Sequence, residues 1–450
     1  MSRAVVSLRS ITASNKEAVE ALRVSPGQEQ FVSTVADSLL EAAEEPDGRA
    51  LYWAVYAEET PVGFVMISDE VGHPDYIPHY LWKLLIDERY QRQGFVGYMP
   101  WSPGPVFGTL GRVSSVSELE NELDAIVAET TFSGVVRVDR AEGIEVAKSY
   151  GWAHRGYEIS NEVDTQFGIA SGTKGLTALT VVRLIEDGHL DLSTTARSVL
   201  GQDLPLIGDD VTIEHLLSHR SGIGDYLDEE AIQDVTEYVL PVPVHELATT
   251  EQYLEVLDGH KTKFVPDERF AYCNGGYVVL ALIAERVSGV PFHDLVRQCV
   301  CEPAGMGDTA FLRSDELPGR AALGYLMIDA EWRTNVFHLP VRGSGDGGIY
   351  STVADISFLW RAFFAGQIVA TDWVNAMARA RSVVPSESMR YGLGFWLHAS
   401  TDTVMLEGCD AGVSFRTVHD PRSSVTHTVI SNTSDGAWAI TQYLDERFAT

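Results

Sequence analysis

The sequence has no apolar run of the ~18 residues that a membrane-spanning helix needs, and its first residues lack the apolar stretch of a secretion signal. Positive charge is also scarce, because 33 Lys and Arg stand against 64 Asp and Glu, a formal net charge of −31. Binding to a phosphate backbone needs clustered Lys and Arg. We therefore expect a cytoplasmic protein that has neither a membrane nor a nucleic acid as its partner.

Cysteine is equally rare, with four in the chain: Cys273, Cys299, Cys301 and Cys409. Their spacing matches neither a disulfide framework nor a zinc site. His215 and His219 form an H-x-x-x-H pair, but Leu216 stands where zinc peptidases of this pattern carry a glutamate. We expect free thiols, no bound metal and no cofactor.

Composition divides the chain into two segments. Within residues 1–112, the apolar runs LYWAVYA from Leu51 and PVGFVMIS from Pro61 predict a β-hairpin. Proline- and glycine-rich sequence then gives way to polar sequence at 113–122, which we interpret as a linker. Over 123–450, strands are predicted at both ends and helices between them, which indicates an α+β fold with one antiparallel sheet flanked by helices.

A serine and a lysine open a helix that the pattern predicts to be buried. Ser171-Gly-Thr-Lys174 precedes a mostly apolar stretch, and Gly188 marks its C-terminal end. Lys174 lies one turn after Ser171 on the same helix face. The helix N-terminus favours negative charge, and a lysine in a buried site can accept a serine proton. These features predict Ser171 as a nucleophile and Lys174 as its proton acceptor.

A second pair follows about a hundred residues later, where Tyr272 and Asn274 precede another apolar helix. In extended backbone, alternate side chains share a face, so the phenol and the amide can point into a common cleft. The phenol can then act as a general base or acid, and the amide can hold either a substrate carbonyl or the lysine.

Together these residues resemble the serine β-lactamase-like superfamily, which includes class C β-lactamases, DD-carboxypeptidases and related esterases, over about residues 123–450. The S-x-x-K and Y-x-N boxes stand at the family's separation, and further stretches are similar to it: LLSHRSGIGDY, CEPAGM, GSGDGGIYSTVADIS and YGLGFW. The resemblance implies an antiparallel sheet flanked by helices, an all-helical subdomain, and a serine hydrolase that forms an acyl-enzyme on an ester, amide or β-lactam-like substrate.

The family's third box is Lys-Thr-Gly or His-x-Gly on a late strand, followed by a residue whose N–H completes the oxyanion hole. We align it with Cys409, Asp410 and Ala411, which makes Gly412 the oxyanion donor. On this alignment the usual cation is missing and Asp410 repels a substrate carboxylate. We therefore expect hydrolysis of neutral esters or amides to be preferred.

The first segment resembles a truncated GNAT acetyltransferase. That family binds coenzyme A through a loop of the type Q/R-x-x-G-x-G/A at a helix N-terminus, and Gln91 and Gly94 match it here. Val96 occupies the last position, and three prolines follow where the helix should run. We favour a relic or docking module in this segment.

Three classes of function thus remain open: a serine hydrolase acting on a small ester or amide, an acetyl-CoA-dependent N-acetyltransferase, and a non-catalytic member that binds a ligand in the same cleft. The oligomeric state is not indicated by the sequence.

Overall fold

In a computed structural model, the chain divides into two compact units, residues 1–113 and 114–450. The structure describes the following residues: 6–12, 14–25, 33–44, 50–57, 60–68, 80–91, 118–229 and 238–448. Of the predicted linker, residues 113–117 lie outside the described residues, and 118–122 are the first five residues of a helix.

Within its described residues, the first unit contains a four-stranded antiparallel sheet in the order β1-β2-β3-β4, with two α-helices. Its elements are β1 (Val6–Arg9), α1 (Lys16–Glu20), α2 (Val35–Glu44), β2 (Ala50–Ala57), β3 (Thr60–Ser68) and β4 (Tyr80–Ile86). The predicted hairpin is present as β2 and β3, whose last pair is Ala57 and Thr60. Apolar residues of the helices and the sheet, including Val19, Val35 and Phe64, form one buried cluster.

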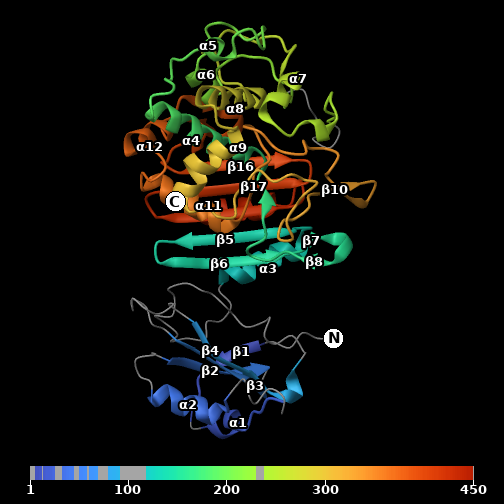
Figure 1. Cartoon of the computed structure of the whole chain (residues 1–450), viewed down its shortest axis with the longest axis vertical. Helices are drawn as coiled ribbons and strands as arrows, with labels where there is room; N and C mark the ends of the chain where they lie inside the picture. Colours follow the sequence, from blue (N-terminus) through green and yellow to red (C-terminus); the bar gives the residue numbers. More distant parts are fainter. Residues whose placement is uncertain are drawn as a thin grey trace. The chain divides into compact units, whose positions relative to one another are not determined.

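The second unit is built on an eight-stranded antiparallel sheet in the order β13-β14-β15-β16-β17-β18-β5-β6. Its strands are β5 (Gly134–Arg140), β6 (Gly143–Tyr150), β13 (Ser382–Val384), β14 (Met389–Tyr391), β15 (Trp396–His398), β16 (Val404–Asp410), β17 (Val413–Asp420) and β18 (Val425–Ser431). β18 pairs with β5, so the two ends of this segment meet in one sheet, as the sequence predicts (Figure 1).

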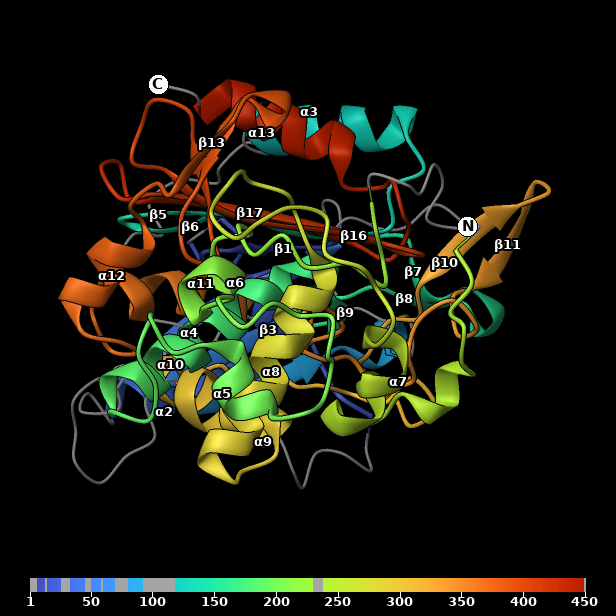
Figure 2. The same ribbon diagram turned by 90° about the horizontal axis from the view of Figure 1, so that it is seen from above.

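Helices cover both faces of this sheet, as the view from above shows (Figure 2). The α-helices described in this unit are α3 (Glu118–Glu129), α4 (Thr173–Glu186), α5 (Ala196–Leu200), α6 (Ile213–Leu217), α7 (Leu254–Leu257), α8 (Asn274–Ser288), α9 (Phe292–Val296), α10 (Glu302–Ala304), α11 (Val353–Phe364), α12 (Thr371–Met377) and α13 (Trp438–Phe448). α3 and α13 lie on one face, and α4 and α11 lie on the other. β18 contacts both α11 and α13, which explains why all seven of its residues are buried.

The helices between the chain ends form the expected helical part, in which α4 and α8 pack together. Three short strand pairs complete the unit: β7 (Trp152–His154) with β8 (Ile159–Ser160), β9 (Phe167–Gly168) with β12 (Tyr350–Ser351), and β10 (Tyr325–Ile328) with β11 (Glu331–Thr334). In the described part of the chain no single helix has the length and apolarity of a membrane span, although the bent pair Asn274–Ser288 and Phe292–Ala304 passes together by length and composition.

The described apolar clusters of residues 114–450 contain residues of that unit alone. We therefore predict that a chain beginning at Ser114 folds by itself and unfolds in a single cooperative thermal transition. Calorimetry checks this, together with the rate of ester hydrolysis measured beside the full chain. Aggregation of the shortened chain, or loss of the transition, would show that residues 1–113 are needed for folding.

Candidate active site

The candidate nucleophile follows a strained residue. Ser171 lies in a 3₁₀ turn, Ala170–Gly172, directly before α4. Ala170 has a φ of 45°, a left-handed conformation that costs an L-residue about 1 kcal/mol or more. The sharp turn leaves the Ser171 side chain partly exposed, whereas the following residues of α4 are buried.

The Lys174 ammonium is surrounded by acceptors from three separate segments. Its Nζ lies 2.8 Å from Ser171 Oγ, 2.7 Å from Asn274 Oδ1 and 2.8 Å from the main-chain oxygen of Asp346. The residue is only 2% exposed. Because burying a charge is costly unless it is paired and hydrogen-bonded, this position fixes Lys174 against Ser171.

Tyr272 completes the group around the serine. Lys174 Nζ lies 4.9 Å from the centre of its ring, and its phenol lies close enough to Ser171 for the serine hydroxyl to lower the phenol pKa. Burial, and next the negative charge of Glu229, raise the pKa of Tyr272 well above its usual value, although the Ser171 hydroxyl lowers it. The phenol therefore keeps its proton, so of the two roles that the sequence leaves open, proton donation is favoured over a phenolate base.

His219 holds the segment that carries Tyr272. Its Nδ1 accepts the N–H of Cys273 at 3.1 Å, and its main-chain oxygen accepts the N–H of Ala271 at 2.9 Å. Its ring lies over that of Tyr272 with the centroids 4.3 Å apart. Burial, followed by the charge of Lys174, lowers the pKa of His219 well below its usual value. His219 is thus a neutral positioning residue.

The side-chain amide of Asn274 binds Lys174. Its Oδ1 accepts from Lys174, and its Nδ2 donates at 2.9 Å both to the oxygen of Leu227 and to Glu229 Oε1. The N–H groups of Asn274 and Gly275, at the start of α8, donate to the Asp225 carboxylate at 2.6 and 2.8 Å. Burial raises the pKa of Asp225 to about 6 although these bonds lower it.

The third box lies three residues earlier than the sequence alignment suggests. A Cβ placed on Gly408 would lie 2.7 Å from the Ser171 nitrogen and 2.4 Å from the Ile169 oxygen, closer than real Cβ atoms approach. Gly408 is therefore the glycine of β16 that packs against the nucleophile. Leu406-Glu407-Gly408 then occupies the place of Lys-Thr-Gly, and the following residue is Cys409.

Gly412, predicted as the oxyanion donor, is in the β-turn between β16 and β17 with a φ of 74°, and its N–H donates to Ser434 Oγ at 2.8 Å. Asp410 and Val413 close this two-residue turn. Because hydrogen-bonded and non-hydrogen-bonded pairs alternate along an antiparallel ladder, the N–H of the preceding Cys409 points away from β17. β15 pairs only with Val404 and Met405. The Cys409 N–H thus lies on the edge that faces Ser171.

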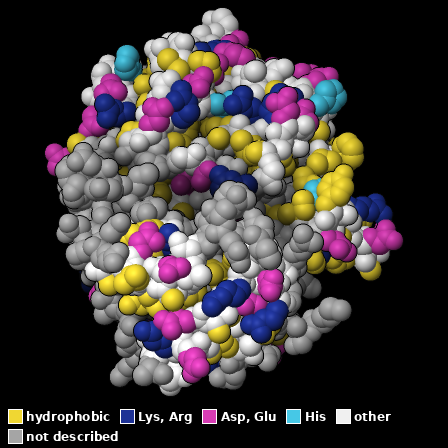
Figure 3. Space-filling view, turned by 60° about the horizontal axis from the view of Figure 1, so that its bottom comes forward, with side chains coloured by type: hydrophobic (Ala, Val, Ile, Leu, Met, Phe, Trp, Pro, Cys, Tyr) yellow, Lys and Arg dark blue, Asp and Glu magenta, His cyan; other side chains and the backbone are white. Residues whose placement is uncertain are grey.

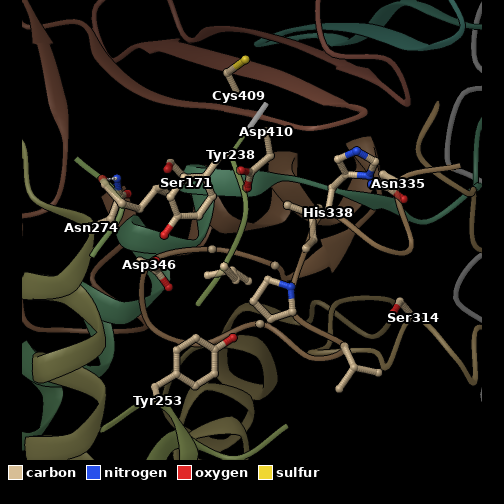
Figure 4. A pocket seen from close by; sticks show the side chains of 18 of the residues that line it. Ser171, Tyr238, Tyr253, Asn274, Ser314, Asn335, His338, Asp346, Cys409 and Asp410 are labelled. Atoms are coloured by element: carbon tan, nitrogen blue, oxygen red, sulfur yellow. Dashed lines mark hydrogen bonds between the residues drawn. The ribbon is translucent and has the colours of Figure 1, made fainter. Parts of the chain in front are cut away.

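A cavity of about 250 Å³ opens onto Ser171 (Figure 4). The Asp410 carboxylate points into it, whereas the Cys409 sulfur points away and lies 3.6 Å from the Ser434 oxygen. The Cys409 side chain, aligned with the third box in the sequence, thus points away from the cavity, since successive side chains of a strand point to opposite faces. Burial, and next the charge of Asp346, raise the pKa of Asp410 to about 7.

Asp346 is a site residue for which the sequence analysis assigns no role. Its main-chain oxygen accepts from Lys174, and its Oδ2 accepts from the Tyr226 hydroxyl at 2.5 Å. The glycines around it in GSGDGG let the loop pack closely against α8, because a Cβ on Gly345 would lie 2.1 Å from the main-chain oxygen of Tyr277. In the sequence, the feature that could have identified Asp346 as a site residue is that it is the single acidic residue of this glycine-rich stretch.

The predicted coenzyme A loop is described only at its first residue. The Gln91 amide donates to the Ile86 oxygen at 2.9 Å, and Gly94 lies outside the described residues. The resemblance of residues 1–112 to acetyltransferases stays a prediction.

Comparison with known proteins agrees with the site. The Beta-lactamase family model matches residues 119–444, which is most of the chain. The chain belongs to this family. The crystal structure of a penicillin-binding protein from Bacillus halodurans superposes with a TM-score of 0.69 at 33% identity, covering 72% of this chain and all of that one.

Two curated relatives of this Beta-lactamase family member are named as hydrolases. Esterase EstB of Burkholderia gladioli is 30% identical over 49% of this chain and 57% of its own length. The D-alanyl-D-alanine-carboxypeptidase/endopeptidase AmpH of Escherichia coli K12 is 28% identical over 47% and 52%. The chain spans 57% to 64% of the length of the first curated relatives that it matches.

We predict that Gly408→Ala lowers kcat/KM for ester hydrolysis by about 10²-fold or more, since the new methyl must displace the backbone of Ser171 or the oxyanion edge. It should also destabilise the fold by about 1–3 kcal/mol, as overpacking does. Steady-state kinetics and thermal unfolding measure the two effects.

Gly307→Ala is the matched control, because a Cβ there meets no atom within 4 Å and the backbone is not left-handed. It should leave both quantities near those of the unmodified chain. Full activity in Gly408→Ala would contradict the placement of the third box at Gly408.

Proposed function

We propose that the chain is a serine hydrolase that forms an acyl-enzyme at Ser171 on a small ester or amide. The observation that carries this is the 2.8 Å contact between Lys174 Nζ and Ser171 Oγ, in a buried site that opens onto a cavity. A nucleophile within hydrogen-bond reach of a base, which is itself held by further groups, is the arrangement that covalent catalysis needs.

The contacts of Lys174 suit both of its protonation states. As an amine, it can donate its two N–H bonds to Asn274 Oδ1 and the Asp346 oxygen and accept the Ser171 proton through its lone pair. As an ammonium, it donates to all three oxygens. Transfer of the proton from Ser171 to Lys174 therefore requires no movement of the surrounding acceptors, which lowers the reorganisation that accompanies attack.

In the first step Ser171 Oγ bonds to the substrate carbonyl carbon, and its proton passes to Lys174. The N–H groups of Ser171 and Cys409 face the carbonyl oxygen as it becomes negative. The leaving alcohol or amine takes a proton from Tyr272, which its raised pKa keeps in the phenol form and which recovers a proton from Lys174. Water then attacks the ester of Ser171 by the reverse sequence and releases the acid.

No cation stands ready for a substrate carboxylate among the described residues that line the cavity. Two arginines outside the lining are engaged elsewhere: Arg342 donates to the main-chain oxygen of Phe311, and Arg416 pairs with Glu407 and Asp445. This supports neutral acyl groups over those that carry a carboxylate near the scissile bond, in keeping with the prediction from Asp410.

Ser171→Ala should abolish hydrolysis of p-nitrophenyl acetate and the acyl adduct seen by intact-mass spectrometry, with the thermal transition retained. Lys174→Ala should reduce kcat by about 10²–10⁴-fold, the usual contribution of general acid–base catalysis. Lys148→Ala, which removes an exposed ammonium paired with Asp124, is the control and should remain active. Unchanged turnover in Ser171→Ala would place the nucleophile elsewhere and refute the proposal.

A further inference from the structure

The cavity beside Ser171 is lined by charges of one sign. On the described surface in Figure 3, acidic and basic side chains are interspersed. The described lining of the cavity instead carries three carboxylates, Glu229, Asp346 and Asp410, and neither Lys nor Arg. The site therefore attracts a positively charged ligand by its overall charge.

The three carboxylates differ in what they already bind. Glu229 accepts from the Asn274 amide, and Asp346 accepts from the Tyr226 hydroxyl. The Asp410 carboxylate has no hydrogen-bond or ion-pair partner within the described residues, and it points into the cavity (Figure 4). The nearest cation, Lys174, is already in contact with three oxygens. Asp410 is thus the carboxylate that remains available to a ligand.

Asp410 also lies near the position of the reacting carbonyl. A Cβ on Gly347 would lie 3.7 Å both from Asp410 Oδ2 and from the Ala170 oxygen, which belongs to the residue before Ser171. Asp410 directly follows Cys409, whose N–H faces the nucleophile. A group bound by Asp410 would therefore be attached within a few bonds of the scissile carbonyl.

The rest of the cavity is mainly apolar, although Ser314, Asn335 and His338 also line it. Away from Ser171 its wall is formed by aliphatic and tyrosine side chains, among them Leu240, Leu312, Leu339, Val341 and Tyr253. Such a wall favours an apolar substituent of moderate size, since its burial is favourable and makes no demand for hydrogen bonds.

We propose that this site takes esters or amides of amino acids or similar acyl groups in which a free ammonium lies beside the scissile carbonyl, with Asp410 binding the ammonium and the apolar wall receiving the side chain. This inference rests on the proposed hydrolase function and adds the class of its acyl group. It also accounts for the presence of Asp410 four residues after Leu406, which holds the place of the family's cation.

The test measures binding separately from turnover. Full-length Ser171→Ala is titrated by calorimetry with three probes that differ only at the α-nitrogen: leucine amide, N-acetyl-leucine amide and N-succinyl-leucine amide, each in both enantiomers. At pH 7, one enantiomer of leucine amide should bind at least tenfold more tightly than its N-acetyl form, and the succinyl form, which adds a carboxylate, should bind most weakly.

Asp410→Asn in the same background should remove this preference for leucine amide, whereas Asp402→Asn, which removes an exposed carboxylate paired with Arg422, should retain it. In the wild type at Ser171, Asp402→Asn should hydrolyse p-nitrophenyl acetate at the rate of the unmodified chain. A tenfold preference that survives in Asp410→Asn, or equal or absent binding of all three probes, would overturn the inference. If the unmodified chain does not hydrolyse p-nitrophenyl acetate, the proposed function itself is refuted.

The pH dependence gives a second readout. Asp410 faces Asp346, Glu229 and Lys174, and His338 lines the same cavity. The pKa of Asp410, about 7, means that its carboxylate is largely protonated at pH 5.5. Leucine amide stays an ammonium over this range. Its binding should therefore weaken at least fivefold between pH 7 and pH 5.5, because Asp410 must lose a proton to bind it, and the neutral N-acetyl probe should change less. Equal pH dependence of the two probes would contradict the role of Asp410.

Discussion

The arrangement of the site depends on one buried ammonium. Lys174 stands in a helix whose neighbours are apolar, and the cost of burying its charge is offset only if its acceptors are present and correctly placed. Those acceptors come from the turn at Ser171, from the start of α8 at Asn274 and from the loop at Asp346, which is 172 residues away in the chain. Each segment is fixed in turn: Asp225 binds the start of α8, and Tyr226 binds Asp346. The requirement of a single charge thus ties the helical part of the unit to the loop beside the cavity.

The second constraint is the close approach of the β16 backbone to the backbone of the turn at Ser171. On the edge opposite β17, β16 has no partner strand beyond Met405, and the turn that carries Ser171 lies along that edge. The approach is possible only because position 408 has no side chain. The left-handed Ala170 turns Ser171 towards the cavity. The unpaired edge of β16 presents an N–H group where the carbonyl oxygen of the substrate would lie, so the two features act together. Strain at Ala170 is maintained by the packing on both sides of the turn.

Much of this follows from the sequence, and the remainder shows what local patterns omit. The apolar stretches after Ser171 and Asn274 predict α4 and α8, and the strands predicted at the C-terminal end of the segment are present as β16, β17 and β18. The sequence also contains both Gly408 and Gly412, and nothing in their immediate neighbours tells which one packs against the nucleophile. That choice depends on contact between segments more than two hundred residues apart. The role of Asp346 is equally hidden, because it binds Lys174 through a main-chain oxygen that every residue possesses.

Placing the third box three residues earlier, at Leu406–Gly408, also changes the role of Asp410. If Cys409 and Asp410 replaced the cationic residue directly, the strand would only have lost a function, and a weakened or inactive site would be the natural reading. With Leu406 in that place, Asp410 lies beyond the oxyanion edge, on the face of the strand that borders the cavity. An aspartate there, next to Asp346 and Glu229 and without its own partner, is costly to keep ionised in the empty site, as its raised pKa reflects. A ligand that supplies a positive charge removes that cost, so the feature that destabilises the empty cavity is the one that would make binding selective.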